Sequence, residues 1–469
     1  MTDIETVRNE MHKFVDTYLD ELKGLEESDI LKLANTEQIN KLSEIDVPTD
    51  PRPLNETMAE MRDEIYDYRA KLNHPRFFGF VPGPASLESW AGEVMTSAFN
   101  MHAANWMTCP TASYIEEKLI TWLGTKIGYD PDQVGGIFVS GGSLANLTAV
   151  VAARESKIAA DKIHLATAYI SKQTHSSLIK ALKIAGISPE NIRILKTDDD
   201  YEMDVADLKA TLQADIDQGL IPFMIIATSG TTNTGSVDPL HETADIAAAH
   251  NMWFHVDGAY GASVLLSDKY RHLLDGIERA DSVSWDGHKW LYQTYGCGMV
   301  LVKDKFDLVN AFSEHPEYLR DFKIKDDEIN FADYGIELTR PARALKLWLT
   351  LQTMGTDKIN DSINHNIELA KLAKKELQSL DHWEIVSEPE MAIINFRFSP
   401  ESISEEEKDR INELASKQIL AENYAGVFTT ILHDQVVLRI CTINPATTAE
   451  DIKTTIHKLD EIANRIVSE

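Results

Sequence analysis

The lysine in SWDGHKWL, residues 284–291, lies among aromatic residues and outside any cluster of charges. Trp285, Trp290 and Leu291 suggest that the chain around Lys289 is buried. A buried ammonium group is costly unless it is paired or used in chemistry. The alternative is a lysine whose stem covers apolar surface while its amine reaches water. This stretch alone leaves both interpretations open.

Three further polar motifs follow short apolar runs. GIFVS is followed by GGSLANL, in which Gly142 and Ser143 begin a helical pattern that could seat a phosphate, unless Ser143 only caps the helix. His175 follows a second run, where a structural role is equally open. Asp257 ends the apolar run MWFHVD and is followed by two small residues, Gly258 and Ala259. A carboxylate at that place needs a partner, either a structural arginine or a cationic ligand atom.

These motifs lie in a region where strand-like and helix-like patterns alternate. Apolar, β-branched runs occur at 136–140, 164–171, 191–197, 222–230, 252–260, 281–286 and 298–303, and helical patterns separate most of them. The alternation predicts an α/β domain with a largely parallel sheet of about seven strands, covered on both faces. Ligands of such sheets bind beyond the carboxyl ends of the strands, where all of these motifs lie.

The chain divides into three expected parts. Residues 1–75 carry helical patterns but are too few for a core of their own, so we expect them to pack on a dimer partner or the main body. Residues 76–350 would form the large ligand-binding domain. Residues 351–469 alternate helical and strand patterns of an antiparallel α+β unit.

Composition excludes several classes of function. A formal net charge of −30 argues against binding to nucleic acid or to anionic membranes. No apolar run approaches the ~18 residues that a membrane span requires. The chain has three cysteines, Cys109, Cys297 and Cys441. They are not spaced like metal ligands, so we expect no metal site, and their small, odd number predicts a reducing, cytoplasmic location.

Together the strand ends offer an amine, a carboxylate, a histidine and an anion seat. Pyridoxal 5′-phosphate needs an amine for its aldehyde, a carboxylate for its ring nitrogen and a site for its phosphate. We therefore predict that Lys289 binds this cofactor. A dinucleotide-dependent oxidoreductase is the competing class, but the chain lacks GxGxxG and the acidic residue that follows it.

The motifs HSS, HVDGAY and DGHKW, in this order and spacing, resemble those of the group II pyridoxal phosphate-dependent decarboxylases. The resemblance extends from HPRFFGFVPGP (74–84) to LKLWLTLQ (345–352), and more loosely to the end. Within the group, the chain is most similar to bacterial aromatic-L-amino-acid decarboxylases of the tryptophan decarboxylase type. This implies the fold type I architecture of pyridoxal phosphate-dependent transferases and a homodimer with its site at the subunit interface.

The implied reaction is decarboxylation of tryptophan, tyrosine, phenylalanine or DOPA to the amine and CO2. A decarboxylase for glutamate, aspartate or cysteine sulfinate is the alternative. No arginine stands out near residues 77–106 to bind an acidic side chain, which favours the aromatic substrates.

The resemblance also implies roles for individual residues. Lys289 would hold the cofactor, Asp257 would pair with its ring N–H, and His175 would stack on one ring face and lie near the substrate carboxylate. The full set of implied cofactor-binding residues is Gly142, Ser143, Asn146, His175, Thr228, Asp257, Ala259, His288 and Lys289, with Asn146 expected near the phosphate. Asp286 replaces an asparagine common in the group, and as a second anion it would repel the phosphate.

Family members supply a proton from a tyrosine on a mobile loop, which we expect within residues 313–338. Tyr334 aligns better with this tyrosine than Tyr318 does, and we predict Tyr334 as the catalytic residue. A tyrosine in the loop together with His175 favours simple decarboxylation over aldehyde formation. The resemblance places the substrate among Phe80, His102 and Trp106, with Phe331 reaching in from the partner's loop, although aromatic clusters are more often core.

Overall fold

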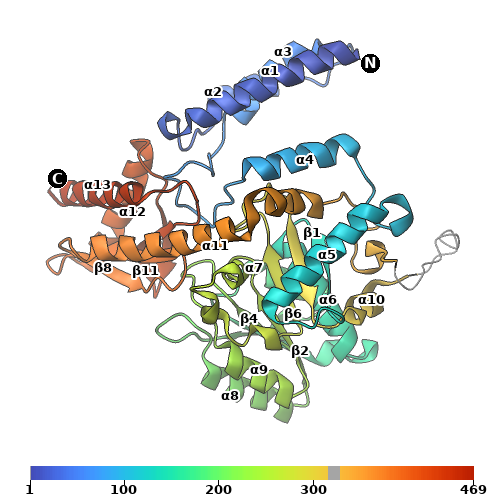
Figure 1. Ribbon diagram of the computed structural model, residues 1–469. Helices are drawn as coiled ribbons and strands as arrows, with labels where there is room; N and C mark the ends of the chain where they lie inside the picture. The colour runs from blue at the N-terminus through green and yellow to red at the C-terminus, as the bar shows by residue number, and fades with distance from the viewer. Residues whose placement is uncertain (1, 315–327, 469) are drawn as a thin grey trace.

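The computed structural model describes residues 2–314 and 328–468, built around a seven-stranded sheet (Figure 1). The strand order is β1-β7-β6-β5-β4-β2-β3. The strands are β1 Gly135–Val139, β2 Ala166–Ser171, β3 Ile192–Leu195, β4 Ile221–Thr228, β5 Trp253–Asp257, β6 Ser282–Asp286 and β7 Gly298–Val302. Every predicted apolar run forms one of them, so the prediction of a mostly parallel α/β sheet is confirmed.

One strand runs against the others. β2, β3, β4, β5 and β6 pair in parallel, whereas β7 is antiparallel to both β6 and β1. β1 therefore points the same way as β6, although the two strands do not touch. As a result, the carboxyl ends of six strands lie at one edge of the sheet.

Helices cover both faces of this sheet because its strands are apolar on both sides. One apolar core forms between the sheet and α6 Gly142–Lys157, α7 Ser176–Ile184 and α10 Phe306–Phe312. The other forms against α5 Pro110–Ile127, α8 Val205–Asp217 and α9 Leu240–Ala249. In β1, Ile137 and Val139 pack in the first core while Phe138 packs in the second.

The C-terminal part is a four-stranded antiparallel sheet of order β10-β11-β9-β8. Its strands are β8 Trp383–Ser387, β9 Ile393–Phe398, β10 Phe428–Leu432 and β11 Gln435–Cys441. It packs with α12 Glu405–Ala421 and α13 Ala449–Ser468. The long α11, Ala344–Leu377, contacts both parts, so the expected boundary at residue 350 falls inside this helix. Non-helical dihedral angles at Gly355 (φ 76°, ψ 161°) kink it.

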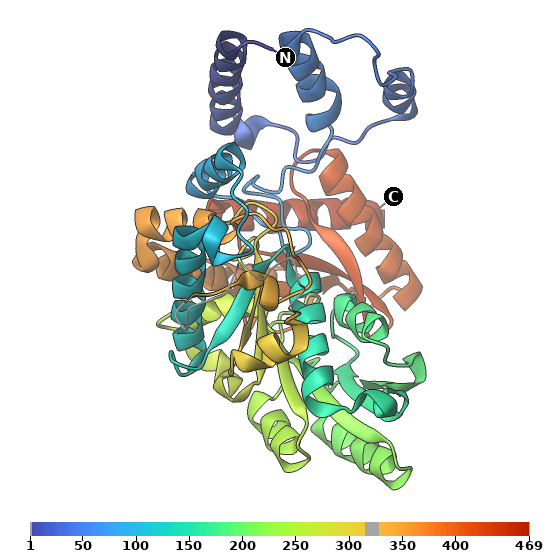
Figure 2. The ribbon, with the colours of Figure 1, turned by 90° about the vertical axis from the view of Figure 1, so that its right-hand side faces the viewer.

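The N-terminal helices lie apart from the main body (Figures 1 and 2). They are α1 Ile4–Lys23, α2 Thr36–Ser43 and α3 Leu54–Glu60, which continues as a π-helical segment, Met61–Tyr66. These helices account for the helical patterns within residues 1–75. α1 buries none of its residues, and its side chains Ile4, Met11 and Phe14 are exposed. The next helix, α4 Leu87–Phe99, packs against α11.

Across residues 2–314 and 328–468, no helix combines the length and the apolar character needed to cross a membrane.

Candidate active site

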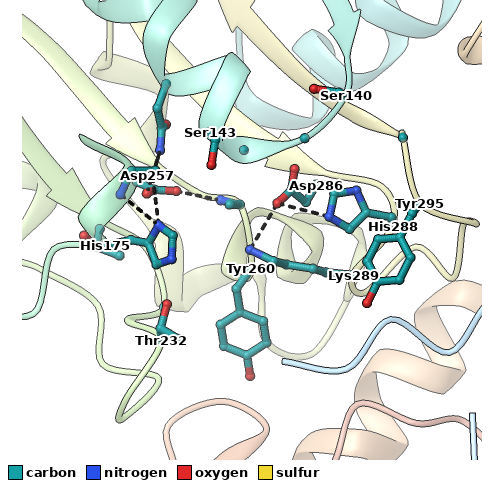
Figure 3. Close-up of a pocket in the computed structure, with 18 residues that line it drawn as sticks. Ser140, Ser143, His175, Thr232, Asp257, Tyr260, Asp286, His288, Lys289 and Tyr295 are labelled. Atoms are coloured by element: carbon teal, nitrogen blue, oxygen red, sulfur yellow. Dashed lines mark hydrogen bonds and ion pairs between the residues drawn. The ribbon is translucent and has the colours of Figure 1, made fainter. Parts of the chain in front are cut away.

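A cavity of about 440 Å³ opens at the carboxyl ends of β1, β4, β5 and β6 (Figure 3). Strand ends and the loops after them supply its walls. The residues that line it are Ser140, Gly141, Gly142, Ser143, Asn146, His175, Ser177, Thr228, Gly230, Thr232, Asp257, Ala259, Tyr260, Asp286, His288, Lys289, Tyr295 and Gly296. All nine residues predicted to bind the cofactor are among them.

The carboxylate of Asp257, the last residue of β5, is buried and held by three donors. Asn146 Nδ2 donates to Asp257 Oδ2 at 3.1 Å. Ser284 Oγ and the backbone N–H of Ala259 each donate to Oδ1 at 3.1 Å. These bonds compensate the burial of the charge and fix the orientation of the carboxylate. An anion held in this way can pair with a cationic ring N–H in the cavity.

A buried chain of hydrogen bonds continues behind Asn146. Because both amide hydrogens of Asn146 are donated elsewhere, its Oδ1 accepts from His255 Nε2, at 3.1 Å. His255 Nδ1 lies 2.8 Å from Ser282 Oγ, which accepts from Trp253 Nε1 at 2.8 Å. Burial lowers the pKa of His255 to about 4, against the opposing charge of Asp257, so this histidine is neutral at neutral pH.

A second set of hydrogen bonds leads from Asn146 to His175, the residue immediately before α7. Ser177 Oγ accepts from Asn146 at 3.0 Å and lies 2.8 Å from His175 Nδ1. The backbone N–H of Ser177 also points to His175 Nδ1, at 3.3 Å. Nδ1 is therefore an acceptor, and His175 carries its proton on Nε2. Asn146 thus joins His175 to Asp257, whereas the sequence had suggested a place near the phosphate.

The start of α6 forms a second polar end of the cavity. The backbone at Gly142 passes so close to its neighbours that an added Cβ would lie 3.2 Å from Ala259 Cβ and 2.9 Å from Asp286 Oδ2. With Ser143, this helix N-terminus offers free N–H groups to an anion. Thr228 Oγ1 lines the cavity and has no hydrogen-bond partner among the described residues, so a ligand can supply one.

Lys289 faces this cavity and is paired. Its Nζ lies 3.1 Å from Oδ2 of Asp286, the last residue of β6, and its side chain is 25% exposed (Figure 3). His288 Nε2 lies 3.7 Å from the same oxygen, while its Nδ1 donates to the carbonyl of Cys297 at 3.0 Å. Burial lowers the pKa of His288 despite the nearby Asp286 charge. The amine is thus held at a cavity by a buried carboxylate instead of reaching water on an apolar stem.

The residues predicted to contact substrate do not line this cavity. Phe80 is 65% exposed and stacks on Phe428, with ring centroids 5.5 Å apart. Trp106 donates its backbone N–H to Asn330 Oδ1 at 2.9 Å, next to the buried Phe331. The chain after His102 is also tied to this loop, since the Ala332 N–H bonds to the Ala104 carbonyl at 2.8 Å. His102, Trp106 and the buried Phe331 therefore lie on segments that are tied together, outside the cavity of their own chain.

The predicted catalytic tyrosine is also outside the cavity. Tyr334 is 9% exposed and packs against Phe331, with ring centroids 5.7 Å apart. Burial raises the pKa of its hydroxyl to about 12. The other candidate, Tyr318, lies outside the described residues, as does residue range 315–327 of the predicted loop.

Sequence reasoning missed several functional candidates. Ser177 and His255 stand inside HSS and HVDGAY, motifs in which only His175, Asp257 and Ala259 had been assigned roles. His255 precedes Asp257 by two residues, so the alternation of a strand puts both on one face. Tyr295 and Gly296 line the cavity from a loop without a recognisable pattern.

The site fits pyridoxal phosphate: it offers an amine at Lys289, an oriented carboxylate at Asp257 and an anion seat at α6. A family model described as the pyridoxal-dependent decarboxylase conserved domain matches residues 36–399. An aromatic-L-amino-acid decarboxylase of Bacillus atrophaeus is 36% identical over 465 residues, which cover 98% of this chain and 96% of the relative.

Two plant enzymes extend the comparison. A phenylacetaldehyde synthase of Arabidopsis thaliana is 31% identical over 466 residues, covering 96% of this chain and 94% of the relative. The crystal structure of Oryza sativa TDC with PLP and tryptamine superposes with a TM-score of 0.94 at 29% identity and covers 99% of both chains. The predicted resemblance is confirmed by these matches, and the chain belongs to the family of pyridoxal-dependent decarboxylases.

Proposed function

We propose that this protein decarboxylates aromatic L-amino acids, such as tryptophan, tyrosine, phenylalanine or DOPA, to the amine and CO2. Pyridoxal phosphate would bind in the cavity at Lys289. The observation that supports this most is that Lys289, Asp257 and His175 line the same cavity in a member of this family.

Each of these residues has a task that follows from its contacts. When bound, the cofactor supplies a protonated ring that withdraws electrons from the Cα–carboxylate bond of the amino acid. Asp257, held by three donors, would pair with the ring N–H of the cofactor. Lys289 would hold the cofactor through its amine, which lies at the cavity. His175 presents its Nε2–H to the cavity, where it can orient the substrate carboxylate.

The phosphate end is formed by different residues. Gly142 and Ser143 would bind the phosphate through the N-terminus of α6, together with His288, which also lines the cavity. Thr228 has a hydroxyl without a hydrogen-bond partner among the described residues and would bind the cofactor, and Ala259 would pack on its ring.

The lining of the cavity favours an aromatic over an acidic substrate. No arginine is among its lining residues in the described part of the chain. Arg439 lies behind the wall, but its three guanidinium nitrogens already donate to the carbonyls of Phe80, Thr232 and Asn233. A glutamate or sulfinate side chain would therefore find no free arginine here.

The active unit in this proposal is a homodimer. His102 and Trp106 lie outside their own cavity, on segments tied to the loop around residues 330–332, and a second copy of the chain can bring these segments to the neighbouring cavity. The apolar side chains that α1 exposes, including Met11 and Phe14, support burial of this helix on a partner. The dimer would then complete the substrate pocket.

A cytoplasmic location is also part of the proposal. All three cysteines are free and buried, which fits a reducing compartment.

The test is to incubate the purified protein and pyridoxal phosphate with each common amino acid and DOPA, and to identify products by mass spectrometry. We expect the amines of aromatic substrates with an equal amount of CO2, and none with Lys289→Ala. Release of amine from glutamate or cysteine sulfinate alone would overturn the substrate class. Phenylacetaldehyde from phenylalanine would instead assign the chemistry of the Arabidopsis relative.

A further inference from the structure

Asp286 is a buried carboxylate with only half of its hydrogen-bonding capacity used. It is 2% exposed, and its Oδ2 lies 3.1 Å from Lys289 Nζ and 3.7 Å from His288 Nε2. Its Oδ1 is buried without a hydrogen-bond partner among the described residues. A buried acceptor that lacks a donor is costly, so this oxygen is expected to find a partner when the site is filled.

The anion seat of the cofactor lies directly beside this carboxylate. An added Cβ at Gly142, the first residue of α6, would be 2.9 Å from Asp286 Oδ2. On the other side, an added Cβ at Gly298 would be 2.6 Å from Asp286 Oδ1. Backbone thus encloses the carboxylate on two sides, and the N-terminus of α6 faces both Asp286 and the expected phosphate. Two adjacent anions repel each other strongly where water is excluded.

The other titratable groups around Asp286 cannot neutralise both anions. Burial lowers the pKa of His288, which leaves Lys289 as the nearby cation on the same loop. Burial raises the pKa of Cys297 to about 12, so the thiol before β7 stays neutral. Lys346, on α11, is held by Glu93 at 2.7 Å.

Two groups on the remaining sides add no positive charge. From β5, the neighbouring strand, the charged group is the Asp257 carboxylate, another anion. Burial raises the pKa of Tyr295, whose ring packs on His288, so this phenol stays neutral.

We propose that Asp286 is a positioning residue that takes up a proton when the phosphate of the cofactor binds. In the free protein its carboxylate holds the Lys289 amine at the cavity. With phosphate bound, the protonated carboxyl removes one of the two facing anions and gains an O–H donor. This inference rests on the proposed binding of pyridoxal phosphate at the start of α6.

The test uses pyridoxamine 5′-phosphate, which carries the phosphate but has no aldehyde to react with Lys289. Binding to the cofactor-free full-length protein is measured by calorimetry from pH 6 to 9, in two buffers of different ionisation enthalpy to count protons. The variants are Asp286→Asn, which has the same shape without the charge, and Asp245→Asn, an exposed carboxylate on α9. Pyridoxamine, which differs from this ligand only by lacking the phosphate, is the control ligand.

We expect wild-type protein and Asp245→Asn to take up a proton at pH 8 and to bind more weakly as the pH rises. Asp286→Asn should bind about tenfold tighter at pH 8 and take up about one proton less, because the proton linkage is gone. Pyridoxamine should bind all three proteins alike. If Asp286→Asn does not fold by circular dichroism, Asp286→Ser replaces it.

Equal affinity and equal proton uptake in wild type and Asp286→Asn would overturn the inference. The same holds if His288→Gln, and not Asp286→Asn, abolishes proton uptake. Either result leaves the proposed function standing, since the phosphate still binds. Failure of every variant to bind pyridoxamine 5′-phosphate would overturn the proposed cofactor site together with this inference.

Discussion

Asn146 Nδ2 donates to Asp257 Oδ2 at 3.1 Å and thereby ties α6 to the end of β5. The same amide group also donates to Ser177, which bonds to His175. One side chain therefore orients both the carboxylate expected at the cofactor ring nitrogen and the histidine expected at the substrate carboxylate. A change at Asn146 should disturb both groups at once.

We expect Asn146→Asp to lower kcat/KM by about 10- to 100-fold, the range for outer partners of site residues. The new carboxyl cannot donate to Asp257 unless it is protonated, so the activity should recover in part at lower pH. The pH profile of kcat/KM measures this. Asn251→Asp, where the exposed amide oxygen accepts from Lys157, is the control and should behave as wild type. A profile of unchanged shape would contradict the role of Asn146.

Substitution of the two candidate tyrosines, Tyr334 and Tyr318, should have opposite effects on amine formation. Tyr334 is 9% exposed and burial raises the pKa of its hydroxyl to about 12, so it is a poor proton donor and Tyr334→Phe should retain most of the amine formation. Tyr318→Phe should suppress the amine if Tyr318 supplies the proton. Product analysis with an aromatic substrate decides between them. Loss of amine in Tyr334→Phe alone would restore the preference that the sequence suggested for Tyr334.

The shared site predicts complementation between inactive subunits. Lys289→Ala and Trp106→Ala should each be inactive, or nearly so, as homodimers. Co-expressed in equal amounts, they should recover about a quarter of wild-type activity, because half of the dimers are mixed and each contains one intact site. Tandem affinity purification of the mixed dimer and a decarboxylation assay measure it. No recovery would place Lys289 and Trp106 at a site within one chain.

Glu202 predicts a pH-dependent stability that is separate from catalysis. Burial, followed by the charges of Glu390 and Asp198, raises its pKa from 4.5 to about 7. Between these values the folded protein binds more protons than the unfolded chain, so stability falls as the pH rises through this window. Because Glu202 is only half-buried, we expect Glu202→Gln to raise the free energy of unfolding by about 1 kcal/mol at pH 8 and to leave it unchanged near pH 4.5.

Urea unfolding of the cofactor-free protein at several pH values measures this difference. Glu413→Gln, at a half-exposed carboxylate on α12, is the control and should match wild type throughout. If Glu202→Gln raised the free energy of unfolding equally at all pH values, the raised pKa of Glu202 would not be the cause of the stabilisation.

The sequence by itself determined the sheet and the reactive end of the site. The seven apolar runs are strands, and because parallel strands end at one edge, Asp257, Lys289 and the Gly142–Ser143 turn had to meet there. The antiparallel direction of β7 was not visible, since a short apolar run carries no information about its direction.

Only the tertiary structure decided which way side chains turn and which neighbours they meet. Asn146 reaches Asp257 across 111 residues, and Trp106 reaches Asn330 across 224, contacts that no local pattern encodes. Phe80, His102 and Phe331 were assigned to the substrate pocket by resemblance to the family, but their places depend on how distant loops pack. Spacing along the chain determines which residues share a face of an element, whereas the packing of several elements determines what that face touches.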